Sequence, residues 1–354
     1  MFGIKRLKVL IWSATISILT SCGGDSVVDE EQSGFLELYG SAQGTTYSII
    51  VADRNIALSQ YEIDSLLDRF DEVLSTYKEN SIISQINRAK DSLSIEDPTN
   101  WFDDCYRISE KVYKESHGAF DPSIMPLVDA WGFYRKRSQV PDQAQIDSLL
   151  SLVSFENGKK HTYSNKNGLI KFIKTNKEYR LDFNAVAQGL SVDVVADYIR
   201  ARGAKNYYVE IGGEIRVAGK NREGENWRIG IDSPQISDTV RLLDQIIAIS
   251  DKGIATSGNY RKFYVEDGVK YSHTIDPRIG KPVQHTLLSA TVITKSTGLA
   301  DAWATAFMVI GKDEAIKLLN SGLDQELDVY FIYDDGNEGY AHWMSSGFEQ
   351  YLTD

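Results

Sequence analysis

The order of strands and helices limits the fold of this chain more than any single motif does. Residues 36–52 alternate around a glycine turn and predict two strands, while Ser59 and Glu62 form a capping box that opens a helix. Further helices are predicted over 101–116, 141–153, 185–202, 295–310 and 313–319, and strands or hairpins over 168–183, 206–219, 227–232, 245–250, 287–294, 327–333 and 339–344. Because these elements lack a strict strand–helix–strand alternation, the sequence predicts an α+β protein of mixed or antiparallel sheets with packed helices.

Residues 1–21 have the pattern of a lipoprotein export signal. Three basic residues precede an apolar run from 9 to 19 that is too short to span a bilayer comfortably, and small residues then lead into Cys22. We expect cleavage before Cys22 and acylation of its thiol, which would hold the protein on a membrane through lipid chains. An ordinary signal peptide that happens to end beside a cysteine is the alternative.

Composition then divides the mature chain and narrows its partners. Residues 22–34 predict the lipidated cysteine and a flexible acidic tether, and residues 35–354 one folded domain. The formal net charge of −12 argues against nucleic acid as a partner, so an anionic substrate would need a bound cation or oriented amides. With Cys22 lipidated, Cys105 has no partner in the chain, and its place on an apolar helix face predicts a buried free thiol.

The helix predicted over 295–310 is apolar except for an acid and a hydroxyl one turn apart. Asp301 and Thr305 are separated by four positions, which places both side chains on one helical face. A carboxylate with a neutral oxygen suits a hard cation such as Mg²⁺, which keeps coordination positions open for phosphate. The alternative is a helix that shows Asp301 to solvent while Thr305 bonds to its own backbone.

Several glycine- and aspartate-centred segments stand out, and each taken singly is compatible with a turn or a helix cap. In chain order they are Gly44-Thr45-Thr46-Tyr47, Leu74-Ser75-Thr76-Tyr77, Gly118-Ala119-Phe120-Asp121-Pro122, Asp182 to Gly189 with Asp193, Gly212-Gly213, Ala255-Thr256-Ser257-Gly258, His273-Thr274-Ile275-Asp276-Pro277 and Ala300 to Thr305. Together, in this order and from about residue 40 to 319, they resemble the FAD:protein FMN transferases, or ApbE-like flavin transferases.

The resemblance implies an enzyme with FAD as its donor substrate. A Ser or Thr hydroxyl in the flavinylation motif of an acceptor flavoprotein attacks the phosphorus next to riboflavin, FMN becomes joined to the protein, and AMP leaves. Mg²⁺ is required. Members commonly work outside the cytoplasm, so we expect this chain in a bacterial cell envelope, anchored to the inner membrane on its periplasmic side.

The resemblance also assigns roles to individual residues. Asp301, Thr305 and the backbone carbonyl of Ala185 are expected to hold Mg²⁺. His273 is expected to be the general base or proton relay, since an unperturbed imidazole titrates near neutral pH; a histidine that only orders the following turn is the alternative. The residues expected to contact FAD are Gln43, Tyr77, Ala119, Phe120, Asp121, Asp182, Gln188, Gly212, Gly213 and Ile275.

Three positions depart from the common family pattern. Gln43 stands where many members have Met, Gln188 where Lys or Glu is frequent, and Ala304 where some members have a second Asp. The last departure leaves fewer carboxylates for the cation.

Two other activities remain open from the sequence: a metal-dependent FAD pyrophosphatase that releases FMN and AMP, and a lipoprotein that binds FAD without chemistry.

Overall fold

The computed structural model describes residues 35–133, 140–234, 242–259, 263–266, 269–323, 326–336 and 339–353. The predicted signal peptide, the lipidation site at Cys22 and the tether lie outside these residues. Across the ranges that the structure describes, no helix combines the length and the apolar character needed to cross a membrane.

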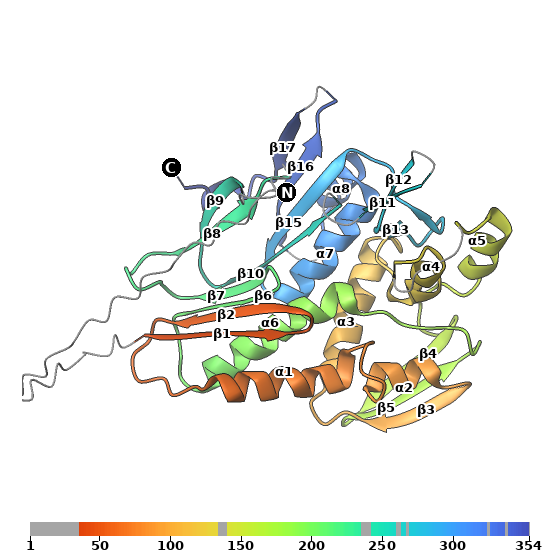
Figure 1. Cartoon of the computed structure of the whole chain (residues 1–354), viewed down its shortest axis with the longest axis horizontal. Helices are drawn as coiled ribbons and strands as arrows, with labels where there is room; N and C mark the ends of the chain where they lie inside the picture. The colour runs from red at the N-terminus through yellow and green to blue at the C-terminus, as the bar shows by residue number, and fades with distance from the viewer. Residues whose placement is uncertain are drawn as a thin grey trace, which may run out of the picture. The chain divides into compact units, whose positions relative to one another are not determined.

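The main sheet of the described residues has eight strands, and each neighbouring pair is antiparallel (Figure 1). Its order is β1 (Leu36–Ala42), β2 (Thr45–Val51), β6 (Tyr207–Ile211), β7 (Glu214–Ala218), β10 (Lys252–Gly258), β15 (Leu287–Thr294), β16 (Asp328–Asp334) and β17 (Tyr340–Met344). This pairing confirms the predicted α+β class, because a doubly wound fold is built on a mostly parallel sheet.

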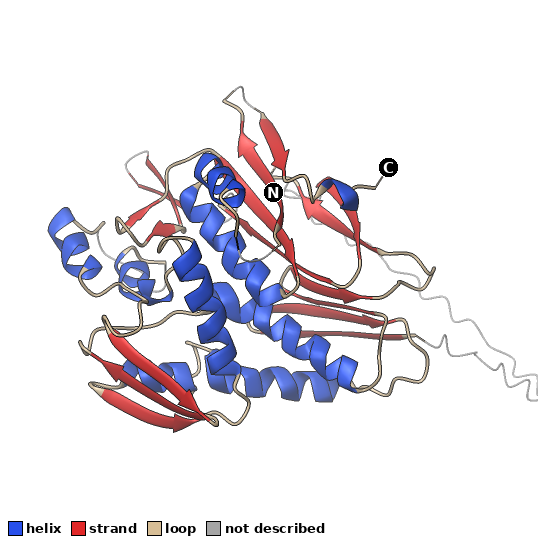
Figure 2. Ribbon diagram, turned by 180° about the vertical axis from the view of Figure 1, so that it is seen from behind, coloured by secondary structure: helices blue, strands red, loops and turns tan. Residues whose placement is uncertain are grey.

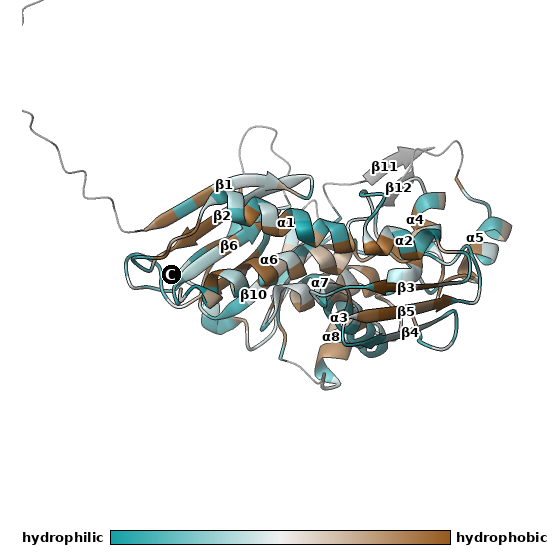
Figure 3. Ribbon diagram, turned by 90° about the horizontal axis from the view of Figure 1, so that it is seen from below, coloured by the Kyte–Doolittle hydropathy of each residue, from teal (hydrophilic) through white to brown (hydrophobic). Residues whose placement is uncertain are grey.

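Helices cover one face of this sheet, as Figure 2 shows. The long ones are α1 (Gln60–Leu74), α3 (Trp101–Glu115), α6 (Asn184–Ala201) and α7 (Thr297–Ile310), and the short ones α2 (Ile82–Arg88), α4 (Met125–Ala130), α5 (Gln143–Leu150) and α8 (Lys312–Asn320), with 3₁₀ turns η1 (Pro122–Ile124) and η2 (Glu349–Tyr351). The predicted capping box of α1 is present, since the Glu62 amide donates to Ser59 Oγ and the Ser59 amide donates to the Glu62 carboxylate. Hydrophilic and hydrophobic residues both appear along α1 in Figure 3, and its apolar side chains pack toward β2 and α6.

The opposite face of the main sheet is covered by a hairpin of β8 (Trp227–Asp232) and β9 (Leu243–Ile249). Trp227, Ile229 and Ile231 are alternate residues of β8, and all three are buried. They share a core cluster with Val217 of β7 and Ile293 of β15. The period of two along β8 therefore turns its apolar side chains toward the main sheet.

A separate three-stranded sheet corrects one prediction. Its order is β3 (Ser92–Glu96), β5 (Leu169–Lys174) and β4 (His161–Lys166). The turn between β4 and β5 lies at Asn167 and Gly168, whose φ angles of 51° and 83° suit a two-residue hairpin. The hairpin predicted over 168–183 is therefore wrong, because β5 ends at Lys174 and pairs with strands that precede it.

Several further elements have no counterpart among the predicted helices and strands. Among them are the strands β3 and β10, although the Ala255-Thr256-Ser257-Gly258 segment of β10, taken singly, is compatible with a turn. The remaining short strands are β11 (Phe263–Glu266), β12 (Val269–Ser272), β13 (Ile275–Asp276) and β14 (Lys281–Pro282).

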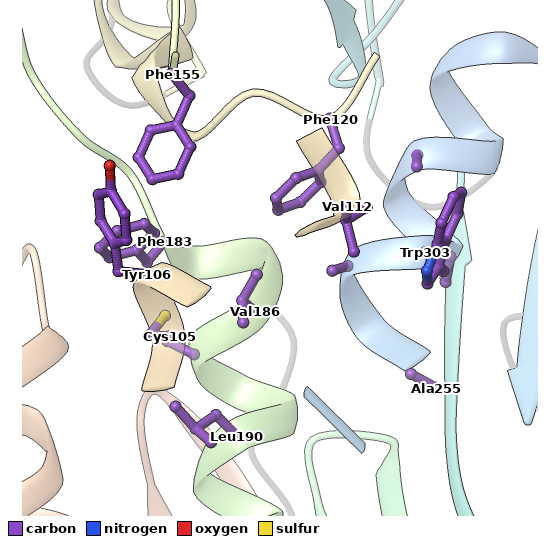
Figure 4. Packing of buried hydrophobic residues seen from close by; sticks show 14 of the residues in the cluster. Cys105, Tyr106, Val112, Phe120, Phe155, Phe183, Val186, Leu190, Ala255 and Trp303 are labelled. Carbon is purple, nitrogen blue, oxygen red and sulfur yellow. The ribbon is translucent and has the colours of Figure 1, made fainter. Parts of the chain in front are cut away.

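Helix α7 is the central element of the core. It is buried on nearly all sides, with Trp303 and Phe307 fully enclosed. Figure 4 shows side chains of α3, α6 and β10 gathered around it, including Cys105, which is buried and free as predicted. Each large apolar side chain that is fully buried contributes about 1.5–3 kcal/mol, so several together offset the several kcal/mol that a buried carboxylate costs.

Helices α6 and α7 cross in contact at Gly189. A Cβ atom added to Gly189 would lie 2.5 Å from the Thr297 carbonyl oxygen and 2.9 Å from Asp301 Cβ. Only glycine permits this separation, so the predicted motif ending at Gly189 has a packing role that its sequence alone does not show.

We predict that Gly189→Ala lowers the free energy of unfolding by about 1–3 kcal/mol, because the added methyl group overpacks the crossing. Urea unfolding measures the change. Gly298→Ala serves for comparison. Its added carbon would meet the Leu190 nitrogen at 3.1 Å, a less severe contact, so the free energy of unfolding should fall by less. Equal stability of wild type and Gly189→Ala would contradict the tight crossing.

Candidate active site

Asp193 on α6 fixes the start of α7. Its Oδ1 accepts a hydrogen bond from the Thr297 amide at 3.0 Å, and its Oδ2 accepts from the Gly298 amide at 3.0 Å and from Ser296 Oγ at 2.7 Å. A carboxylate at this place satisfies amides that the first turn of a helix leaves without partners and favours the positive end of the helix dipole. Asp193 therefore sets the register in which α7 presents its polar residues.

Asp301 is buried at the α6–α7 crossing. Its side chain is 6% exposed, and its Oδ2 accepts a hydrogen bond from the Gly189 amide at 3.2 Å. Burial raises the pKa of Asp301 to about 7. The alternative in which α7 shows this acid to solvent does not hold.

The backbone of α6 departs from helical geometry beside this contact. Ala185 has φ −85° and ψ 17°, which breaks the helix in its first turn. A break of this kind arises where a side chain enters the helical hydrogen-bond ladder, and Asp301 does so at Gly189. The predicted carbonyl ligand therefore lies at the one irregular residue inside α6.

Thr305 joins the polar face of α7 to strand β10. Its Oγ1 lies 3.3 Å from Ser257 Oγ, so the hydroxyl contacts a neighbouring strand. Ser257 belongs to the motif Ala255-Thr256-Ser257-Gly258, to which the sequence analysis assigned no role. In the structure, Ser257 lies beside Thr305, a predicted cation ligand.

Glu214 is a second, partly buried acid near Asp301, and the sequence analysis did not select it. Its Oε2 accepts a hydrogen bond from Gln188 Nε2 at 2.7 Å, and the same amide nitrogen donates to the Ile211 carbonyl at 3.2 Å. Burial, and then repulsion from the Asp301 charge, raises the pKa of Glu214 well above its usual range. An acid directly after the glycine pair was the available clue, because the turn at Gly212 and Gly213 brings it back toward α6.

Gly212 itself makes room for Gln188. Its φ is +65°, and an added Cβ would lie 1.9 Å from Gln188 Nε2. The glycine thus permits both the left-handed turn and the close approach of the amide side chain.

Eight of the predicted site residues line one cavity of about 390 Å³, which we call the inner cavity. They are Ala119, Phe120, Asp121, Asp182, Ala185, His273, Ile275 and Thr305. These residues come from segments far apart in the sequence, and the fold brings them to one place on the helix-covered side of β10.

Two carboxyl groups of the inner cavity are held by local hydrogen bonds. Asp121 accepts from the Ser123 amide and hydroxyl at 2.7 and 2.6 Å, and burial raises its pKa to about 6. Asp182 accepts from the Asn184 amide at 2.8 Å, and burial raises its pKa as well. Each acid accepts a hydrogen bond from an amide at the start of a helical turn, so both side chains have fixed orientations at the cavity wall.

A second cavity of about 870 Å³, which we call the outer groove, contains three more predicted residues. Gln188, Gly212 and Gly213 line it together with Glu214 and residues of β8. The outer groove and the inner cavity share Ser257, Gly258 and His273. His273 therefore stands where the two spaces meet.

Two predicted FAD contacts lie apart from both spaces. Gln43 forms the β1–β2 turn, where its amide nitrogen donates to Asp71 and its amide oxygen accepts from Ser191. Tyr77 follows α1 and is 78% exposed. Neither lines the inner cavity or the outer groove, and their role in binding FAD stays a prediction.

Three oxygen-bearing groups at α7 and the start of α6 have the donor chemistry that suits a hard cation with few protein ligands. Among the described residues, no group of three or more His, Cys, Asp or Glu side chains is placed to hold a metal. Asp301 would supply one carboxylate, and Thr305 and the Ala185 carbonyl would supply neutral oxygens. This donor chemistry suits Mg²⁺, which commonly binds through one or two carboxylates and completes its shell with water or phosphate.

Comparison with known proteins identifies the family. The model of the ApbE family matches residues 43–331. The chain belongs to the ApbE family. A Vibrio cholerae protein named FAD:protein FMN transferase is 35% identical to it over 348 residues, which cover 97% of this chain and 98% of the relative.

Solved structures of the ApbE family share the fold. The flavin transferase ApbE from Vibrio cholerae superposes with a TM-score of 0.77 at 34% identity and covers 90% of this chain and 99% of its own. The flavinyl transferase ApbE from Pseudomonas stutzeri gives the same TM-score at 28% identity, with 90% and 96% covered.

Proposed function

We propose that this ApbE-family chain transfers FMN from FAD to a hydroxyl group of an acceptor protein. The observation that carries the proposal is the junction at His273, where the inner cavity beside Thr305 meets the outer groove. The relative named FAD:protein FMN transferase, similar over nearly the whole chain, supports the same activity.

The reaction exchanges one phosphoester link for another. The acceptor oxygen bonds to the phosphorus that carries riboflavin, the bond from that phosphorus to the bridging oxygen breaks, and AMP leaves with the bridging oxygen. The hydroxyl proton must pass to a base. Such a transfer depends mainly on positioning and on stabilising negative charge, with little covalent chemistry for the protein.

The inner cavity is the proposed binding site for FAD. Phe120 and Ile275 contribute apolar wall, and Asp182 is an oriented polar group beside them. A flat amphiphilic ligand requires this combination of apolar surface with a few fixed polar groups.

Asp301, Thr305 and the Ala185 carbonyl are the proposed ligands of Mg²⁺. When bound, this ion supplies positive charge against the diphosphate. The protein's part is to hold the carboxylate in place, which it does through the Gly189 amide and the fixed start of α7. Because the chain is acidic, an anionic substrate would be repelled unless a bound cation offset its negative charge at the site.

The experiment that tests the function combines the protein with FAD, Mg²⁺ and a candidate acceptor flavoprotein. Covalent flavin fluorescence on the acceptor together with AMP in solution is the expected result. Free FMN and AMP with no labelled protein would instead indicate a pyrophosphatase, and intact FAD would indicate binding without chemistry.

Asp301→Asn should lower Mg²⁺-dependent FMN transfer by about 10²-fold or more, because charge stabilisation at the diphosphate is lost. Initial rates over a Mg²⁺ series measure the effect. Asp197→Asn, on the exposed side of α6, is the matched control and should keep the wild-type rate. A wild-type rate for Asp301→Asn at every Mg²⁺ concentration would overturn the ligand assignment.

His273→Ala should lower the transfer rate by about 10²–10⁴-fold if His273 takes the acceptor proton. FAD binding, followed by flavin fluorescence, should change little. His342→Ala, an exposed histidine on β17, is the control. A loss of less than tenfold would place the base on another residue and leave His273 as a residue that orders the following turn.

We also propose that Cys22 carries a lipid that anchors the enzyme to the inner membrane, facing the periplasm. The basic, apolar and small-residue pattern before Cys22 supports this location. Cys22→Ala should move the protein from the membrane fraction to the soluble fraction of the cell envelope, whereas Cys105→Ala should leave it in place. Retention of Cys22→Ala on the membrane would contradict the anchor.

A further inference from the structure

We infer that the outer groove binds an extended segment of the acceptor protein and guides its hydroxyl to the inner cavity. This inference rests on the proposed function and specifies where the second substrate enters. Three features support it: the position of the groove, the strand edges in its walls, and the charge of its lining.

The first feature is the connection between the two spaces. They share Ser257, Gly258 and His273, and Ser257 Oγ lies 3.3 Å from Thr305 Oγ1. In an in-line phosphoryl transfer, the attacking oxygen and the leaving group lie on opposite sides of the phosphorus. The acceptor therefore needs an entrance distinct from the cavity that holds the departing nucleotide, and the outer groove opens at that junction.

The second feature is the backbone along the walls. Five consecutive residues of β8, 228–232, line the groove, but only Leu243 of β9 does. Since successive strand side chains point to opposite faces, such a continuous run means that the groove follows the edge of β8. Within the described residues, β8 pairs with β9 alone.

A second strand edge lies near the junction. Strand β7 pairs with β10 only as far as Ile254, whereas β10 continues to Gly258. Beyond Ile254, the pairing of β10 in the described part of the chain is with β15. The edge of β10 that faces away from β15 therefore borders the groove at Thr256, Ser257 and Gly258. An extended peptide can add main-chain hydrogen bonds to edges of this kind.

The third feature is the composition of the lining. Glu210, Glu214 and Asp232 contribute carboxyl groups, and the basic side chains among the described lining residues are Arg228 and His273. A lining with more acidic than basic groups suits a polypeptide that carries Lys or Arg near its reactive hydroxyl.

The test uses synthetic peptides with one central Thr and either a Lys or a Glu at a varied neighbouring position. Wild-type enzyme with FAD and Mg²⁺ should attach FMN to peptides of the Lys set, detected by mass spectrometry, with kcat/KM at least fivefold above the Glu set. Labelling of a folded acceptor protein, followed in parallel, reports on the proposed function independently.

Gly230→Phe on β8 should raise the peptide KM at least tenfold, because the ring narrows the groove. The added Cβ would meet only the mobile end of Leu243, at 2.7 Å, so the strand can accept it. Lys171→Phe places the same ring on an exposed residue of β5, outside both spaces, and should keep the wild-type KM. FAD affinity, measured by flavin fluorescence, should be the same in both variants.

Three results would overturn the inference. They are an unchanged peptide KM in Gly230→Phe, a preference for the Glu peptides, and a folded acceptor that is labelled while no peptide is. If neither the folded acceptor nor any peptide gains FMN, the proposed function itself is wrong.

Discussion

The close crossing of α6 and α7 is the constraint on which the rest of the site depends. Gly189 lets the two helices meet, and the Gly189 amide then becomes a hydrogen-bond donor to Asp301. Asp193, one turn further along α6, holds the first amides of α7. The same pair of helices therefore buries a carboxylate and orients it on α7, the helix that also carries Thr305.

Strand β10 connects this helix pair to the two spaces of the candidate site. Ala255 faces the helices, and Ile254 packs toward the β8–β9 hairpin, so β10 separates two layers. β10 continues beyond the last residue that it pairs with β7, and both cavities reach its final residues. The end of β10 thus borders both spaces, the inner cavity proposed for the nucleotide and the outer groove proposed for the acceptor protein. A transferase needs both, because its two substrates meet at one phosphorus.

Much of the fold followed from local patterns. The capping box at Ser59, the apolar periodicity of α6 and α7 and the hairpin around Gly212 were predicted from sequence, and the structure contains them. The hairpin over 168–183 and the strand β10 were not predicted correctly, because each depends on a distant partner. β5 pairs backward with β4 and β3, and β10 is rich in Gly, Ser and Thr, so its strand state comes from its neighbours in the sheet.

The sequence by itself determined the residue types of the site, since Asp301, Thr305, His273 and the glycine motifs are recognisable by spacing and by family resemblance. It did not determine which acids are buried or which residues share a space. Those properties depend on contacts across the chain: Asp301 is buried by Gly189, and Glu214 reaches Gln188 through a turn that only Gly212 permits. Tertiary structure alone divided the predicted residues between an inner cavity and an outer groove. The two spaces form because layers that are distant in the sequence pack on the two faces of the main sheet at the end of β10.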